Sequence, residues 1–299
     1  MDNKYLLNPS FKDIAKDHTA FCIFGGPSSN ETQNIDNIIK NNFTVTVNHS
    51  IAKYPNVDLF LTADNLISRE YFEDKEFFSH KFIGGKMIEE ASQFKYKKEP
   101  TWIQGKRNTV LSQNPNLIKI IGCCHFPCYN HNFSSGQLYK YYGVEYCKEI
   151  PNTYLCLLHK DANNDPNPVL SLTLPETVDT YGTDMGKIIV GGNVSGILLQ
   201  VLWYMGFSKV ITVGLGDNGK STGYSEQHWK EAPTKGFEWS NASLHSVLVH
   251  NKIWGKNLKT LHGGDVFRDY CDFPKANYDE LETTPEKKNQ LINKLISNK

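Results

Sequence analysis

The amino-acid sequence predicts an α/β fold of the Rossmann-like type, with a doubly wound, mostly parallel sheet, helices on both faces and an irregular insertion or lid in the middle. Short β-branched, apolar runs recur in the first quarter of the chain and again after its midpoint, and each ends in glycine or a small polar residue. Between them, apolar residues return at helical spacing. At 299 residues, the chain is long enough to bury a large core.

The first part of the chain predicts three strands in quick succession. Residues 20–26 form an apolar run closed by two glycines, and isoleucines then recur at helical spacing from Ile35. Residues 43–47 and 58–62 are further apolar, β-branched runs, and polar residues follow each of them. The short distances between these runs are typical of parallel strands joined by crossover helices.

The second half predicts a buried helix between two strands. Residues 188–190 lead into a glycine-rich turn, and the helix that follows, over 197–205, is apolar on nearly all sides. A helix of that composition is buried. Residues 209–214 are the next predicted strand.

Towards the end of the chain we expect a helix over 244–254 and a last strand over 258–261. Residues 285–299 form a basic amphipathic helix, which either docks on its own domain or contacts a partner or membrane surface.

The middle of the sequence is less regular. Residues 81–83 and 117–121 have the composition of strands, whereas 161–175 are rich in Asn, Asp and Pro, as loops and lids are. We therefore expect a single Rossmann-like domain over 1–270, with an insertion at about 85–185, and a helical tail over 271–299.

Charge and cysteine usage argue against a nucleic-acid-binding, membrane-spanning or disulfide-bonded protein. Basic and acidic residues both number 32, so no global positive field attracts nucleic acid, and we expect at most peripheral membrane contact. The N-terminus lacks a secretory pattern and no apolar run is long enough for a membrane span, so we expect a cytoplasmic protein with reduced thiols. The cluster from Cys123 to His131 either gathers a zinc ion or is a strand end with packed thiols; the missing second ligand pair favours the strand end.

The predicted strand ends supply small and polar residues to one edge of the sheet, where open α/β sheets bind their ligands. The candidate nucleotide-binding residues are Gly25, Gly26, Pro27, Ser28, Asn48, Asp64, Asn65, Asn193, Ser195, Gly196, Gly214 and Asp217. Glycine also simply ends strands, so each residue alone is a weak signal. Five such strand ends together predict a shared cleft.

A phosphate-loop pattern occurs at Gly214–Ser221, which spells G-x-x-x-x-G-K-S directly after a predicted strand. That motif requires a helix to begin at its Lys-Ser pair. Residues 222–225 are turn-like instead, and no apolar stripe follows before Pro233. The context therefore argues against a true phosphate loop.

Two segments resemble known families. The run G-G-N-V-S-G-I-L-L-Q-V-L-W-Y-M-G-F-S-K-V-I-T-V-G-L-G-D-N-G is similar to the core of the MptE-like family, which includes archaeal 6-hydroxymethylpterin pyrophosphokinases and motility-associated-factor glycosyltransferases. The opening I-F-G-G-P-S-S with the later V-N-H-S resembles the bacterial family 42 sialyltransferases. Together the resemblance covers residues 20–65 and 188–225.

This resemblance implies a metal-independent glycosyltransferase that transfers a sugar from a nucleotide donor, most plausibly CMP-linked, with no separate cofactor. It implies a histidine as general base, a role suited to imidazole at neutral pH. His245 is the first candidate, His228 and His250 compete with it, and Tyr224 would lie near the leaving phosphate. The acceptor would be a glycan, a lipooligosaccharide or a protein, and the enzyme is a possible homo-oligomer.

Two other functions stay open at this stage. A pterin pyrophosphokinase would keep the fold but use ATP and Mg²⁺, with carboxylates such as Asp64, Asp184 and Asp217 in the cleft. A non-catalytic nucleotide-binding protein is the third possibility. The extra residue before Asp217, compared with the family pattern, puts the specificity for CMP in question.

Overall fold

The computed structural model of the protein describes about half of the chain. The described residues are 11–25, 29, 32–62, 71, 81–83, 86–88, 110–111, 114–124, 150–159, 188–189, 194–215, 254–261, 274–281 and 284–297.

Ten strands and six helical segments lie within these residues. The strands are β1 (Thr19–Ile23), β2 (Thr44–Val47), β3 (Leu59–Thr62), β4 (Lys81–Ile83), β5 (Lys86–Ile88), β6 (Ile118–Cys124), β7 (Thr153–His159), β8 (Ile188–Ile189), β9 (Lys209–Val213) and β10 (Leu258–Thr260). The α-helices are α2 (Ile35–Asn41), α3 (Ser50–Lys53), α10 (Val194–Tyr204) and α12 (Pro285–Ser297), and the 3₁₀ helices are η6 (Gly255–Asn257) and η8 (Tyr278–Glu280).

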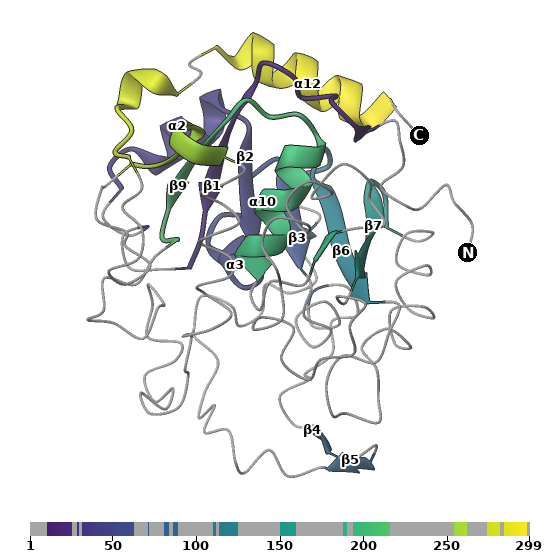
Figure 1. Ribbon diagram of the computed structural model, residues 1–299. Helices are drawn as coiled ribbons and strands as arrows, with labels where there is room; N and C mark the ends of the chain where they lie inside the picture. The colour runs from purple at the N-terminus through teal and green to yellow at the C-terminus, as the bar shows by residue number, and fades with distance from the viewer. Residues whose placement is uncertain are drawn as a thin grey trace.

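Eight strands form one sheet in the order β10-β9-β1-β2-β3-β6-β7-β8, and every pairing in it is parallel. From β1 the chain winds outwards in one direction as far as β8. Helix α10 then carries it back across the sheet to β9, on the other side of β1 (Figure 1). This is a doubly wound sheet, and its winding reverses between β1 and β9. β4 and β5 form a separate antiparallel pair.

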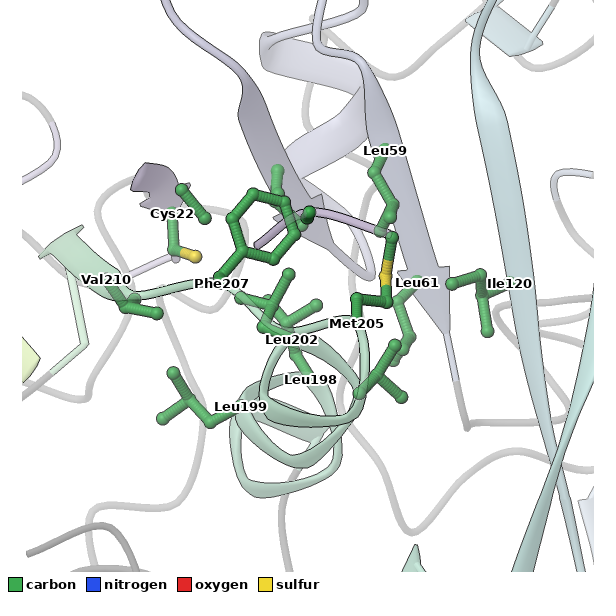
Figure 2. Close-up of a cluster of buried hydrophobic side chains, with 14 of the residues drawn as sticks. Cys22, Leu59, Leu61, Ile120, Leu198, Leu199, Leu202, Met205, Phe207 and Val210 are labelled. Atoms are coloured by element: carbon green, nitrogen blue, oxygen red, sulfur yellow. The ribbon is translucent and has the colours of Figure 1, made fainter. Parts of the chain in front are cut away.

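Alternate residues of the strands enter two separate apolar layers, so the sheet is buried on both faces. Ala20 and Cys22 of β1 face one layer, and Phe21 and Ile23 face the other. α10 covers the first face; Figure 2 shows its leucines below the sheet in one cluster with Met205, which lies beside Leu59 and Ile120, and Phe207, which lies beside Cys22. The second face packs against the isoleucines of α2 and Ile51 of α3. Burial on both faces explains why these strands are continuous apolar runs.

The N-terminal segment caps the end of α10. Asp13 N–H donates to Tyr204 O at 3.1 Å, and Ala15 N–H donates to Met205 O at 2.8 Å. These bonds satisfy two of the carbonyls that every helix leaves without an intrahelical partner. Ser208 N–H donates to His18 O, just before β1 begins, so the C-terminus of α10 lies at the amino end of the sheet.

Helix α12 docks on its own domain, as one of the two sequence-based alternatives proposed. Leu291, Ile292 and Leu295 belong to the core layer on the α10 face. Lys288 is also buried, and its ammonium lies 3.0 Å from Asp58 Oδ1, directly before β3. The ammonium also donates to the Ile39 carbonyl of α2. α12 therefore lies along the amino ends of the strands (Figure 1).

The structure confirms the predicted α/β class and corrects one boundary. Predicted strands over 20–26, 43–47, 58–62, 209–214 and 258–261 match β1, β2, β3, β9 and β10 within a few residues. The range 85–185, however, contains β6 and β7, which pair within the main sheet. Those two strands therefore belong to the sheet and are not part of an insertion. Apart from Trp254, which is helical, the helix expected over 244–254 lies outside the described residues, as does the lid at 161–175.

The carboxylate of Glu280 binds two lysines of neighbouring strands, and we call this contact the clamp. It predicts that the stability of the fold depends on pH. Glu280 Oε2 accepts from Lys259 and Lys209, at 2.5 and 3.0 Å, and Oε1 accepts from Asn277 N–H. The bond from Lys259, followed by those from Asn277 and Lys209, lowers the pKa of Glu280 to about 2 from 4.5. This stabilisation is complete above the unfolded-state pKa and is lost as the pH falls towards 2.

Glu280→Gln is therefore expected to lower the free energy of unfolding by roughly 1 kcal/mol at pH 6, because partial exposure screens the pairs. Urea denaturation at pH 6 and at pH 3 measures the effect, which should shrink at the lower pH. Glu286→Gln, at an exposed position of α12, is the matched control. An equal loss at both pH values would contradict the clamp.

Candidate functional site

The reversal of winding brings two predicted glycine turns side by side. Ile23 of β1 pairs with Val213 of β9, and Phe24 N–H continues the ladder to Val213 O at 2.9 Å. Gly214 directly follows Val213, and Gly25 follows Phe24, so the two glycines leave the sheet within one residue of the same level. Gly214 has φ +69°, a conformation that glycine adopts without steric cost. In doubly wound folds this crevice, outside the carboxyl ends of the strands, is where ligands bind.

Asn48 ends the strand next to β1. Its N–H donates to Leu61 O at 3.2 Å, and it has a left-handed φ of +48°, which asparagine tolerates better than most residues. Its side-chain Oδ1 is buried and accepts no hydrogen bond within the described part of the protein. Asn48 therefore holds a side-chain acceptor at the carboxyl edge, one strand away from the two glycine turns.

The first turn of α10 lies at this same edge. α10 joins parallel strands β8 and β9 and its C-terminus lies at their amino ends, so its N-terminus, with Ser195 and Gly196, lies at the carboxyl ends. Both residues are buried. In general, the N–H groups of a first helical turn and the helix dipole favour an anion.

Five of the predicted site residues are described, namely Gly25, Asn48, Ser195, Gly196 and Gly214, and all of them lie at the carboxyl edge of the sheet. Ten others lie outside the described residues: Gly26, Pro27, Ser28, Asp64, Asn65, Asn193, Asp217, Tyr224, His228 and His245. Of the phosphate-loop pattern, only Gly214 and Leu215 are described. Of the possible zinc cluster, Cys123 and Cys124 end β6, and the rest lies outside the described part.

The structure shows two further polar contacts at this edge that the sequence does not predict. His49, directly after Asn48, lies with its Nδ1 3.3 Å from the hydroxyl of Tyr71. Tyr54, at the end of α3, donates through its hydroxyl to the carbonyl of Ser29. The only signal in the sequence is the V-N-H-S strand end, which names His49 but neither of its contacts.

Two cysteines in the described core offer no reactive thiolate. Cys22 in β1 and Cys156 in β7 are buried and form no disulfide. Burial raises the pKa of both thiols far above the usual value. Since the thiolate is the nucleophile and the metal ligand, both residues act as small apolar core side chains.

The fold and the position of these turns define the class: a doubly wound, parallel α/β protein whose winding reverses between β1 and β9. No protein-family model, curated protein or solved structure matches the chain. Within the described ranges, no helix combines the length and the apolar composition required to cross a bilayer.

Proposed function

We propose that this protein binds a nucleotide in the crevice between β1 and β9 and uses it as the donor in a glycosyl transfer, most plausibly with a CMP-linked sugar. The observation that carries the nucleotide part is the pairing of Ile23 with Val213, which brings the Gly25 and Gly214 turns together where the winding reverses. The transfer part rests on the resemblance to the sialyltransferase and MptE-like families.

The chemistry of the edge suits a nucleotide. Glycine turns allow a phosphate to approach backbone N–H groups closely, and the first turn of α10 adds a helix N-terminus at the same edge. Asn48 follows the Gly25 turn at about the spacing at which Rossmann folds place the residue that binds a ribose hydroxyl. Its Oδ1, which accepts no hydrogen bond from the described residues, would accept one from such a hydroxyl. His245 or His228, with Tyr224, would supply the proton transfer.

The first experiment is a thermal-denaturation series with CMP, UDP, GDP and ATP, with and without Mg²⁺. A ligand at about 100 times its Kd stabilises a protein by ~2.7 kcal/mol. We therefore expect CMP to raise the Tm by roughly 5–10 °C without Mg²⁺. Stabilisation by ATP only with Mg²⁺ would favour the pyrophosphokinase instead, and no stabilisation by any nucleotide would contradict the proposal.

Asn48→Asp localises the binding site, because aspartate tolerates the left-handed backbone and adds a negative charge where the ligand is negative. We expect roughly tenfold weaker CMP binding, the factor that ~1.4 kcal/mol of repulsion represents. Asn289→Asp adds the same charge on the exposed side of α12 and should leave CMP binding unchanged. If CMP binds, release of CMP from a CMP-linked acidic sugar tests the transfer, and full turnover by His245→Ala would exclude that histidine as the base.

A further inference from the structure

A short segment after β2 contacts the residues that follow both neighbouring strands. We call residues 49–54 the brace. Tyr54 ends it, is 7 % exposed and donates through its hydroxyl to the Ser29 carbonyl at 3.3 Å. Ser29 is 2 % exposed and lies four residues beyond Gly25. The brace therefore holds the chain just past the turn after β1.

The other end of the brace contacts Tyr71, which follows β3 in the sequence. His49 Nδ1 lies 3.3 Å from the Tyr71 hydroxyl, and the two ring centroids are 5.9 Å apart. Both side chains are buried. Tyr71 also packs edge-on against Phe60 of β3, at 6.0 Å between centroids. Asn48, between β2 and the brace, is thus directly followed by a residue whose buried side chain contacts Tyr71.

These contacts are directional, which distinguishes them from packing alone. A peptide group is planar, so a hydrogen bond to the Ser29 carbonyl orients that whole peptide group. Phenylalanine at 54 or 71 would keep the ring and its burial but could not donate or accept. The Tyr54 hydroxyl therefore constrains the Ser29 carbonyl, and the His49–Tyr71 contact joins two buried side chains.

We propose that the brace is the positioning element of the nucleotide site, with Tyr54 fixing Ser29 beyond Gly25 and the His49–Tyr71 pair fixing His49 beside Asn48. The identity of the ligand rests on the proposed function, whereas the positioning of Ser29 and His49 is tested in the ligand-free protein. Tyr54, His49 and Tyr71 are positioning residues, because they act through Ser29 and Asn48 on groups that would contact the nucleotide.

The test compares Tyr54→Phe with Tyr278→Phe. Tyr278 is 49 % exposed and lies in η8, whose Glu280 binds Lys209 at the amino end of β9, away from the site. In the ligand-free protein, we expect Tyr54→Phe to speed amide hydrogen exchange in the peptide spanning residues 24–32 by about tenfold, as loss of one net hydrogen bond allows. Exchange in β6 should stay unchanged in both variants.

The second readout is the Kd for CMP. We expect Tyr54→Phe to raise it by about three- to tenfold, with the Tm of the ligand-free protein close to that of Tyr278→Phe. A fall in Tm with unchanged exchange in residues 24–32 and unchanged CMP affinity would show a merely structural tyrosine and overturn the proposal.

The His49 arm has a conservative rescue. Asparagine places an amide near the position of Nδ1, so His49→Asn should retain most of the CMP affinity. The single variants His49→Leu and Tyr71→Phe should each lose most of it. Equal CMP affinity in His49→Asn, His49→Leu and Tyr71→Phe would overturn the role of the His49–Tyr71 contact. If wild-type protein binds no nucleotide, the proposed function fails, and faster exchange in Tyr54→Phe would still establish that the brace positions Ser29.

Discussion

Lys288→Met is expected to lower the free energy of unfolding by about 3–5 kcal/mol at neutral pH, because it leaves a buried carboxylate without its cation. Asp58 is 2 % exposed, and Lys288 Nζ lies 3.0 Å from its Oδ1. Its Oδ2 accepts from the N–H and hydroxyl of Thr44, at 2.8 and 3.0 Å. Neutral hydrogen-bond donors remain in the variant, but no described positive charge replaces Lys288.

The loss should depend on pH. In the wild type, burial raises the pKa of Asp58 to about 6, and the Lys288 charge and the Thr44 hydrogen bonds limit that rise. The folded state thus binds more protons than the unfolded state between pH 3.8 and about 6, so the contribution of Asp58 to stability falls as the pH rises through this window. Without Lys288 the window extends upwards, so the variant should lose most at pH 7.5 and clearly less at pH 5.

Urea denaturation of wild type and variant at both pH values measures this difference. The double variant Asp58→Asn with Lys288→Met removes both charges and should recover a large part of the stability at pH 7.5. The control Lys287→Met removes an exposed neighbouring lysine and should cost little. A loss that is equal at pH 5 and pH 7.5, or one below about 1 kcal/mol, would contradict an ion pair that anchors α12.

Gly206→Ala is the second substitution with a large expected effect, about 2–4 kcal/mol of destabilisation. Gly206 ends the α10 connection with φ +86°, where a side chain is strained. A Cβ there would also lie 2.7 Å from the Asp13 Cα. Asp13 cannot move away easily, because its N–H caps Tyr204 O. Strain and overlap therefore add, and urea denaturation measures the total.

Gly255→Ala separates the backbone strain from the steric overlap. Gly255 has φ +48°, but nothing lies within 4 Å of an added Cβ. It should therefore lose only the conformational part, about 1 kcal/mol. If both variants lost equal stability, the close approach of Asp13 to Gly206 would have no energetic role.

Much of the candidate site could be predicted from the sequence because strand ends carry a local signature. An apolar, β-branched run that stops at Gly25, Asn48 or Gly214 identifies an edge of the sheet wherever the strand lies. The contacts of the brace have no such signature. Ser29 and Tyr71 lie in segments without periodicity, so nothing local links them to Tyr54 and His49.

The sequence by itself determined the class of fold, most of its strands, the buried helix α10 and the amphipathic helix α12, because periodicity and composition act over a few neighbouring residues. Only the tertiary structure decided that β9 lies beside β1, that β6 and β7 join the main sheet, and that Lys288 meets Asp58. The physical reason is that an apolar strand can pair with many others. A buried ion pair likewise joins residues that are distant in sequence and meet only in the folded chain.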